Sequence, residues 1–541
     1  MLAQFRVLCN SLHAFPQTLI QFSRRLGTQG KTIFALSSGR GKCGVAVIRV
    51  SGPRSGVVLS ALAGDTSLLK PRMAQLRTLR NPQSKEILDK AIVIWFPGPK
   101  SFTGEDTCEF QVHGGLAVIS GLLETIGNIP GIFPADPGEF SKKAFFNGSI
   151  DLTEAEGLAD LIHAETEMQR RQAIYQMSGS LHTLYDGWRN TLLQSLAHVE
   201  AYIDFSEDEN IEDGIMHDVK DSITKLAQEV QGHLADGQRG QRLRDGVQAT
   251  IVGEPNVGKS SLLNLLCDKP AAIVTAIAGT TRDVVEQYIN IGGYPLLLAD
   301  TAGIRGDCSA VDAVEKEGIA RAKQFAKVAD VILLVIDTMQ FLNCLDSQEI
   351  TEEFICRYIQ EHLMHLGLLN VNKSRQILKR LQQPSTETVE NGPFYIIIFN
   401  KVDLVVEQHA KRSINNLQSQ YQNVVALSSL TKEGLSQLLF RMEQMLEILC
   451  GNPCQESPAL SQVRHRLHLT DCVDYLHDYL HKTVKISASE INSLKEDSHG
   501  IDLAICAEDL RKAAYHLGRI TGHVTTEQIL DVIFRDFCIG K

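Results

Sequence analysis

The spacing of hydrophobic and polar positions divides the chain into stretches of different period. Between residues 31 and 148, short apolar runs such as "VAVIRVSG" and "KAIVIWF" alternate with glycine-containing turns, which predicts a mixed α/β domain. From Asp151 the pattern becomes helical, first in "DLTEAEGLADLIHAETEMQRRQAIYQM" and then in "LHTLYDGWRNTLLQSLAHVEAYI". Thr153 and Glu156 have the spacing of a capping box at the start of the first helical stretch.

A second α/β pattern follows between about residues 248 and 450. Strand, loop and helix patterns repeat there, and "VQATIVG", "VILLVID" and "FYIIIFN" are typical of buried parallel strands. A polar extension at about 340–390 predicts a surface insertion with one or two helices. After the linker "GNPCQESP" the pattern is helical again. We therefore expect one helical domain made of two chain segments, with the second α/β unit inserted between them.

The first thirty residues differ in composition from the rest. They contain Arg6, Arg24 and Arg25 and no acidic residue, because the first acid is Asp65. This is typical of a mitochondrial transit peptide and predicts location in the mitochondrial matrix. No apolar run approaches the roughly 18 residues needed to span a bilayer, so we expect no membrane anchor. The predicted divisions are 1–30 (transit peptide), 31–148 (N-terminal domain), 149–247 (first helical part), 248–450 (inserted α/β domain) and 451–541 (second helical part).

Length, charge and cysteine content narrow the class of protein. The 541 residues, of which 43% are hydrophobic and 22% charged, indicate several globular domains. A net charge of −11 argues against a generally basic surface for nucleic acid but permits local basic patches. The twelve cysteines lack paired C-x-x-C spacing and indicate free thiols in a reducing compartment. Candidate RNA contacts, more often simply solvated helix positions, are Arg170, Arg171, Arg239, Arg242 and Arg244.

The segment "GEPNVGKS" is the clearest indication of a binding site in the sequence. It matches the phosphate-loop pattern G-x4-G-K-[ST] and lies between a predicted strand and a predicted helix, as that motif requires. Backbone N–H groups of such a loop surround phosphate, and the helix N-terminus adds a favourable dipole. Lys259 is expected to reach the β- and γ-phosphates, and Ser260 to bind Mg²⁺.

Further motifs identify the nucleotide as GTP. Asp300 ends an apolar strand and would hold the magnesium shell, with Thr281 completing it and Gly303 contacting the γ-phosphate. In "NKVD", Asp403 can accept hydrogen bonds from both donors on the edge of guanine, whereas adenine offers neither. The predicted nucleotide-binding residues are Asn256, Val257, Gly258, Lys259, Ser260, Ser261, Thr275, Thr281, Asp300, Thr301, Ala302, Gly303, Asn400, Lys401, Asp403, Ser428 and Ser429.

The residue after "DTAG" departs from the Ras-like pattern. Ile304 stands where a glutamine orients the attacking water in Ras-like enzymes, and isoleucine cannot do so. Either the protein hydrolyses GTP poorly, or other groups place the water and offset the charge. The candidates are Asn256, a bound cation and Glu315, although Glu315 taken alone has the pattern of a solvated helix residue.

The chain carries five informative motifs, namely "GEPNVGKSSLLN", "AIVTAIAGTTRD", "DTAGIR", "NKVD" and the terminal "FCIGK". Together they resemble the MnmE (TrmE) family of tRNA-modification GTPases. The presequence indicates the mitochondrial member of that family. The resemblance covers about residues 31–541 outside the insertion. It implies an α/β plus all-α fold with three parts. These are a folate-binding, dimerising N-terminal α/β domain, a helical domain from two chain segments, and an inserted phosphate-loop GTPase domain with a Ras-like parallel sheet.

The resemblance also implies how GTP is hydrolysed. In the family a K⁺ ion replaces an arginine finger and offsets negative charge on the phosphates. Its ligands would fall on the Asn256 side chain, the carbonyls of Thr275 and Ile277, and Thr280. The acid that positions water through a relay would be Glu315, so Ile304 is expected in this family. The predicted catalytic residues are Glu315, Asn256, Lys259 and Cys538.

The activity implied is C5 modification of the wobble uridine of mitochondrial tRNAs. It would use a homodimer, a flavin-containing partner protein and a one-carbon unit from 5-formyl- or methylene-tetrahydrofolate, and would add a taurinomethyl or a carboxymethylaminomethyl group. Folate contacts would fall on Arg49, Glu109 and Lys541, while Ser149 stands where the family has a lysine contact. Without the resemblance, Arg49 and Glu109 would be ordinary strand-surface charges.

Two other hypotheses about the function are also compatible with the sequence. A mitochondrial switch GTPase for ribosome assembly would share the GTPase motifs but not the folate-type domain or the terminal "CIGK". A prenylation box at "CIGK" fits by position, but Gly540 is not aliphatic and Lys541 is an unusual last residue. The preceding "TTEQILDVIFRDF" predicts a helix that would hold Cys538 and Lys541 in place, with Cys538 either a reagent or a packing neighbour.

The Asp403→Asn variant tests the assignment of the base. We expect it to bind GTP at least about tenfold more weakly, because an amide cannot accept both guanine hydrogen bonds. Competition of GTP and ATP for a fluorescent nucleotide measures this. Guanine selectivity equal to that of the natural protein would contradict the role of Asp403.

Overall fold

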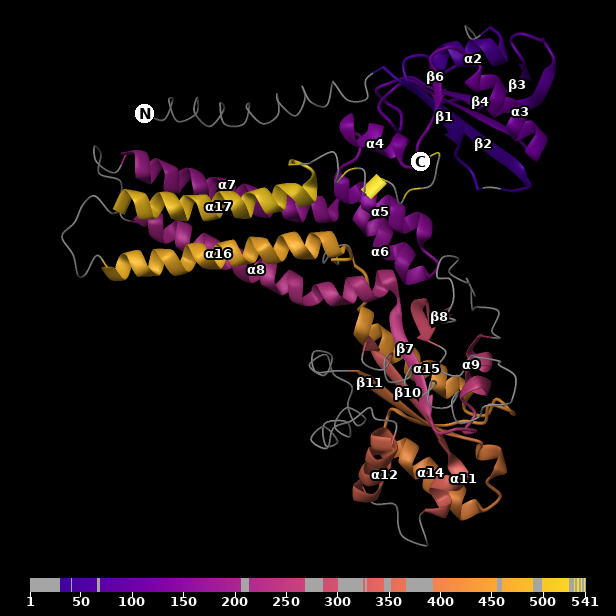
Figure 1. Cartoon of the computed structure of the whole chain (residues 1–541), viewed down its shortest axis with the longest axis vertical. Coiled ribbons are helices and arrows are strands. Elements are labelled where there is room, and N and C mark those ends of the chain that lie inside the picture. Colours follow the sequence, from indigo (N-terminus) through magenta and orange to yellow (C-terminus); the bar gives the residue numbers. More distant parts are fainter. Residues whose placement is uncertain are drawn as a thin grey trace, which may run out of the picture. The chain divides into compact units, whose positions relative to one another are not determined.

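The structure is a computed structural model that divides into two compact units (Figure 1). The first consists of residues 1–159, 176–227 and 468–541, and the second of residues 160–175 and 228–467. The domain boundaries expected from the sequence stay a prediction. The residues that the structure describes are 30–39, 41–65, 69–205, 214–267, 286–299, 325, 328–344, 352–365, 393–454, 460–489, 499–524, 530, 533, 534, 537 and 540.

A six-stranded sheet forms the N-terminal part of the first unit. Its order is β3-β4-β5-β2-β1-β6, and neighbouring strands are antiparallel except β1 and β6, which are parallel. Residues alternate between its faces, so Ile48 and Val50 pack under helices while Arg49 lies on the opposite face. The strands are β1 (Thr32–Leu36), β2 (Cys43–Ser51), β3 (Gln75–Arg80), β4 (Ile87–Phe96), β5 (Thr107–Gly114) and β6 (Ile132–Pro134).

Helices cover both faces of this sheet. On one face, α2 (Ser55–Ala63) and α3 (Leu116–Gly127) bury a large apolar cluster with the alternate residues of β2, β4 and β5. On the other, Phe140 of α4 (Glu139–Phe146) packs against Ile33 and Ala35 of β1. Because Ala35, Arg49 and Glu109 are partners in neighbouring strands, α4 lies over the face that carries Arg49.

Helices from distant segments pack together in the first unit. Near the end of the chain, α17 (His499–Thr521) lies along α7 (Ser180–Phe205), where Arg511 pairs with Glu200 at 2.9 Å (Figure 1). The helical part is therefore built from segments about three hundred residues apart. Four more helices each have residues in both units: α5 (Leu152–His163), α6 (Glu167–Met177), α8 (Gly214–Asp245) and α16 (Val463–Ser489).

The start of α5 corrects the predicted capping box. The cap is Asp151, not Thr153: its Oδ1 accepts hydrogen bonds from the N–H groups of Thr153 and Glu154 and from the Thr153 hydroxyl. The reciprocal bond comes from Glu154, whose carboxylate accepts from the Asp151 N–H at 2.8 Å. Glu156 is buried. The prediction was wrong by two residues because Asp151 begins the helix earlier and offers the acceptor first.

The sheet of the second unit has the order β12-β11-β10-β7-β9-β8. It is parallel except for the edge strand β8, which is antiparallel to β9, so the expected parallel sheet is in fact mixed. The cause is local: Gly292 and Gly293, both at positive φ, join β8 and β9 in a two-residue hairpin turn. The strands are β7 (Val247–Gly253), β8 (Glu286–Ile291), β9 (Tyr294–Ala299), β10 (Val331–Asp337), β11 (Phe394–Asn400) and β12 (Val424–Ala426).

Helices cover both faces of this sheet too. One face packs against α9 (Lys259–Cys267) and α15 (Leu435–Cys450). The other packs against α11 (Thr338–Asn343), α12 (Glu352–His365) and α14 (Gln408–Gln420). The amphipathic helix predicted within the insertion is thus present as α12, and it buries Ile355, Tyr358 and Ile359. Among the described residues, no helix is both long and apolar enough to cross a membrane.

Candidate functional site

The phosphate loop connects β7 to α9 in the second unit. Asn256 and Gly258 have φ of 61° and 101°, so the chain turns through left-handed conformations just before α9 begins at Lys259. Such a turn directs successive backbone N–H groups to one side, where the helix N-terminus also lies. Val257 is buried beneath the loop, whereas Asn256, Ser260 and Ser261 are exposed. The loop therefore has the shape and polarity of a phosphate site.

Lys259 folds back over this loop. Its ammonium donates to the carbonyl oxygens of Gly253 at 2.9 Å and Glu254 at 2.6 Å. These contacts hold the positive charge at the rim of the loop, where a phosphate would compete for it.

Asn400, at the end of β11, joins the phosphate loop to the base side of the site. Its side-chain amide donates to the Val257 carbonyl at 2.8 Å, and its oxygen accepts from the Ser429 N–H and hydroxyl at 3.1 and 3.0 Å. Gly258 makes this arrangement possible, since a Cβ there would lie 2.2 Å from the Asn400 Nδ2 atom. Asn400 thus links the phosphate loop, through Val257, to the loop that carries Ser429, and we call these contacts the Asn400 brace. The motif alone did not reveal this role.

Lys401 and Asp403 complete the base side. Lys401, at φ 65°, places its ammonium 2.7 Å from an Asp337 carboxylate oxygen at the end of β10. Asp403 lies in the short helix η3 (Val402–Leu404) and accepts a 2.6 Å hydrogen bond from the Ser428 hydroxyl. These side chains meet because the carboxyl ends of neighbouring parallel strands share one edge of the sheet.

The structure adds residues that the motifs did not indicate. Thr338 donates its hydroxyl to the Asn400 carbonyl at 2.6 Å, and Asp337 anchors Lys401. The sequence offered one signal for both residues, because Asp337 and Thr338 are the two residues that come directly after the apolar run "VILLVI". Several predicted residues lie outside the described part of the chain: Thr275, Ile277, Thr280, Thr281, Asp300, Thr301, Ala302, Gly303, Ile304, Glu315, Cys538 and Lys541.

The insertion contacts the phosphate loop. His362 of α12 lies 3.3 Å from a Glu254 carboxylate oxygen. These two residues line a cavity of about 1190 Å³ with Phe354, Arg357 and Tyr358. The insertion helix is therefore part of the surroundings of the nucleotide site.

A second polar site lies on the N-terminal sheet of the first unit. Arg49 and Glu109 face each other on β2 and β5, with 2.9 Å between Nε and a carboxylate oxygen. Their side chains are only 19% and 16% exposed, so they are not ordinary surface charges. The guanidinium carbon lies 5.5 Å from the ring centre of Phe102 and 5.8 Å from that of Phe140. This site combines a charged pair with the partly exposed ring of Phe102, while Phe140 packs beneath it in the core.

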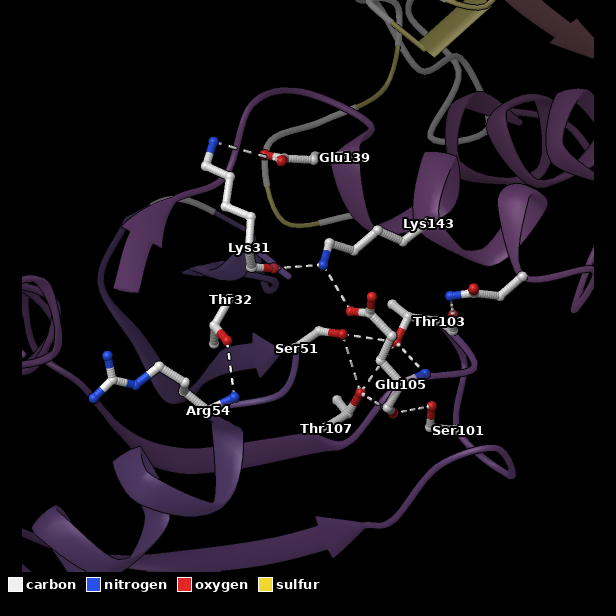
Figure 2. Close-up of polar contacts among 11 residues, drawn as sticks. Lys31, Thr32, Ser51, Arg54, Ser101, Thr103, Glu105, Thr107, Glu139 and Lys143 are labelled. Carbon is white, nitrogen blue, oxygen red and sulfur yellow. Dashed lines mark hydrogen bonds and ion pairs between the residues drawn. The ribbon is translucent and has the colours of Figure 1, made fainter. Parts of the chain in front are cut away.

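A buried lysine lies on the same face of the sheet (Figure 2). The Lys143 side chain, 1% exposed, comes from α4 and donates to Glu105 at 2.6 Å and to the Lys31 carbonyl at 2.7 Å. A buried ammonium needs such partners because desolvation is costly. Sequence reasoning missed Lys143, although a lysine on the apolar face of "EFSKKAFF" was a usable signal. Figure 2 also shows the hydroxyls of Ser51, Thr103 and Thr107 bonded to one another beside Glu105.

Ser149, where the resemblance leads us to expect a lysine contact in the family, ends the turn after α4. Its N–H donates to the Ala144 carbonyl at 2.8 Å. A Cβ on Gly104 would lie 3.2 Å from the Ser149 hydroxyl oxygen, so Ser149 touches the loop that carries Glu105.

The described residues near the C-terminus pack on β1 and α4. The Ser37 hydroxyl donates to the Gly540 carbonyl at 2.8 Å, and a Cβ on Gly540 would lie 2.2 Å from the Leu36 carbonyl oxygen. Phe534 lies directly against Gly138. Phe534 and Phe537 are both buried in an apolar cluster that includes Phe145 of α4. Cys538 and Lys541 themselves lie outside the described residues.

Cys108 is another thiol of this domain, next to Glu109 in β5. Burial, and to a smaller degree the charge of Glu109, raises the pKa of Cys108 far above its usual range. The thiol therefore stays protonated and serves as a packing group.

The candidate RNA-binding arginines are engaged with acids. Hydrogen bonds from Arg170 and then Arg171 lower the pKa of Glu167 to about 2. The pairs are Arg170 and Arg171 with Glu167 at 2.7 and 2.9 Å, Arg239 with Asp236 at 3.3 Å, Arg242 with Asp330 at 2.8 Å and Arg244 with Asp160 at 2.7 Å. These ion pairs are compatible with charged helix positions, and RNA contact at these arginines stays a prediction.

The braced phosphate loop and the Asn-Lys-x-Asp edge define a phosphate-loop GTP-binding protein. The two other domains specify it further. The family described as "GTP-binding protein TrmE N-terminus" matches residues 32–149, and that described as "MnmE helical domain" matches residues 152–538. The chain belongs to the MnmE/TrmE family of tRNA-modification GTPases.

Full-length relatives agree with this assignment. The chain is 48% identical over 512 residues to the mitochondrial 5-taurinomethyluridine-tRNA synthase subunit GTPB3 of Danio rerio, with 94% of this chain and 93% of that protein covered. Identity to the protein of the same name in Homo sapiens is 44% over 512 residues, covering 95% and 94%. The tRNA modification GTPase MnmE of Parvibaculum lavamentivorans is 41% identical over 518 residues, covering 94% and 100%. The resemblance read from the motifs is confirmed.

The Gly258→Ala variant tests the brace at Asn400. We expect GTP to bind about tenfold more weakly or worse, because the added methyl would collide with the Asn400 amide and strain a left-handed backbone. Titration with a fluorescent GTP analogue measures this. Gly232→Ala, on an exposed position of α8 with no atom near the new methyl, is the control and should bind normally. Unchanged affinity in Gly258→Ala would refute the brace.

Proposed function

We propose that this chain is the GTPase subunit of a mitochondrial enzyme that forms 5-taurinomethyluridine at the wobble position of mitochondrial tRNAs. The observation that carries the proposal is 48% and 44% identity, along almost the whole chain, to vertebrate proteins named as mitochondrial 5-taurinomethyluridine-tRNA synthase subunits. Those names agree with the predicted mitochondrial location. They also favour the taurinomethyl group over the carboxymethylaminomethyl group, which the motifs left open.

In this proposal the second unit binds and hydrolyses GTP. Asp403 selects guanine, Asn400 holds the loops in register, and Lys259 exchanges the Gly253 and Glu254 carbonyls for phosphate oxygens. Ser260, exposed in the first turn of α9, suits Mg²⁺ as a hydroxyl ligand, with Thr281 and Asp300 as further ligands. Bound there, the ion would offset charge on the phosphates.

We further propose that K⁺ stimulates hydrolysis. Asn256 is exposed in the phosphate loop at φ 61°, which leaves its amide oxygen available as a ligand. Thr275, Ile277 and Thr280 would complete the set, and Glu315 would position the water that Ile304 cannot hold. A cation here would supply the positive charge that an arginine finger supplies elsewhere.

The N-terminal site is proposed to hold a tetrahydrofolate. The carboxylate of Glu109 suits the donor edge of a pterin, Arg49 suits a glutamyl carboxylate, and the partly exposed ring of Phe102 suits a flat ligand. When bound, the folate would supply the one-carbon unit. Lys541 would approach from the chain end, whose Gly540 is bonded to Ser37 beside β1. Cys538 acts there as a reagent or as a packing neighbour.

The proposed assembly has further members. The relatives' names describe a synthase subunit, which supports a partner protein, proposed here to carry the flavin. A homodimer is proposed through the N-terminal domain. The competing function, a switch GTPase for ribosome assembly, would need neither the folate-type site nor the packed chain end.

Nucleoside analysis tests the function directly. Depletion of this protein should remove the taurine-labelled wobble nucleoside from mitochondrial tRNA in cells fed isotopic taurine, because the GTPase subunit is required for synthesis. Mass spectrometry of digested tRNA measures the product, and isotopic glycine distinguishes the carboxymethylaminomethyl group. The natural chain and Gly232→Ala should restore the nucleoside, whereas Gly258→Ala should not. Unchanged nucleosides after depletion would exclude the modification function and favour the ribosome-assembly reading.

The cation requirement has its own test. GTP hydrolysis by the natural chain should be about tenfold or more faster in K⁺ than in Na⁺, because the proposed K⁺ would offset negative charge on the phosphates. Asn256→Ala should lose this stimulation and keep GTP binding, as measured by phosphate release and nucleotide titration. Asn415→Ala, exposed on α14, is the matched control. Equal rates of the natural chain in both salts would rule out the K⁺ proposal.

A further inference from the structure

Three side chains with metal-binding atoms converge where α16 meets α17 in the first unit. His468 and Asp471 lie three residues apart on α16 and so share one face of that helix, and His516 faces them from α17. The Nδ1 atom of His516 lies 3.3 Å from Nδ1 of His468 and 3.3 Å from a carboxylate oxygen of Asp471. The three ligand atoms all lie within 4.8 Å of one another. Further along the same two helices, Lys482 bonds to Asp509 at 2.5 Å, so the two helices face each other at both places.

These separations have the size of a metal coordination sphere. Zn²⁺ holds imidazole nitrogen at about 2.0–2.1 Å in a tetrahedron, which puts neighbouring ligand atoms about 3.3–3.4 Å apart. Both separations from the His516 nitrogen equal 3.3 Å. The remaining separation, between His468 and Asp471, is set by an Asp471 side chain that is 53% exposed and can turn at small cost.

We propose that His468, Asp471 and His516 bind a divalent transition-metal ion, with Zn²⁺ as the best fit. Two imidazoles and one carboxylate suit Zn²⁺, Co²⁺ or Ni²⁺, whereas Mg²⁺ and Ca²⁺ prefer oxygen ligands alone. The half-exposed Asp471 leaves one side open, so water takes the fourth position. The bound ion joins α16 to α17 and fixes the contact between them.

The surroundings hold the His516 ring in place. The ring lies 5.6 Å from that of Tyr475 and 5.7 Å from that of Tyr515, and only 18% of the side chain is exposed. Such packing limits rotation of the ring and keeps its Nδ1 atom near the other two ligand atoms.

Cobalt titration of the tag-free full chain tests the proposal. The protein is treated with EDTA, dialysed and titrated with Co²⁺ without nucleotide, so that the phosphate loop offers no magnesium-type site. We expect one Co²⁺ per chain with a visible absorption band typical of nitrogen and oxygen ligands. His468→Ala and His516→Ala should each weaken binding by at least about tenfold, the effect seen on disturbing even the partners of metal ligands. His481→Ala, exposed on the same helix α16, should bind normally.

A thermal measurement separates lost binding from lost folding. In EDTA, the natural chain and the His468→Ala, His516→Ala and His481→Ala variants should show the same helical circular dichroism. Zn²⁺ should then raise the melting temperature of the natural chain and of His481→Ala by roughly 2–4 °C, but not that of the other two. Equal Co²⁺ affinity in all four proteins, or thiolate charge-transfer absorption that assigns the ion to cysteines, would overturn the proposal.

Discussion

The nucleotide site depends on the hydrogen bonds of one buried side chain, that of Asn400. It is 2% exposed, and its amide bonds at the same time to the phosphate loop and to the loop after β12. An unmade hydrogen bond in such a place costs about 1–3 kcal/mol, so the loops are held in one arrangement. Gly258 completes the constraint by leaving the space that the amide fills. The groups for the phosphates and for the base are therefore positioned by the same contact.

In the first unit, a buried pair of charges holds neighbouring segments together, as the Asn400 amide does in the second. Lys143 is buried against Glu105, and removing one partner of such a pair costs about 3–5 kcal/mol because the other charge stays buried. Lys143 and Phe140 come from α4, and Gly138 just before it receives Phe534. The helix that covers the Arg49–Glu109 face thus also receives the end of the chain. The polar site and the C-terminal segment share one support.

Much of this arrangement could be predicted from the sequence, where the signal was local. The phosphate loop, the guanine motif and the helical periods can each be recognised from residues that are close together in the sequence. Relatives confirm the family that these motifs indicate. The errors were local as well. Asp151 took the cap expected at Thr153, and the Gly292–Gly293 turn made β8 antiparallel in a sheet expected to be parallel. Both departures have local causes: the Asp151 side chain accepts from the first N–H groups of the helix, and two adjacent glycines at positive φ form a hairpin turn.

By itself, the sequence determined which chemical groups the chain carries, the local backbone that presents them, and the family to which it belongs. Only the tertiary structure decided which distant groups meet. Arg49 faces Glu109 because of the register of two strands, and Asn400 reaches Val257 because parallel strands end at one edge. His516 meets His468 and Asp471 because two helices face each other. Residue spacing fixes a local conformation, but register and helix contacts are set by burying apolar surface across the whole unit, which no single motif contains.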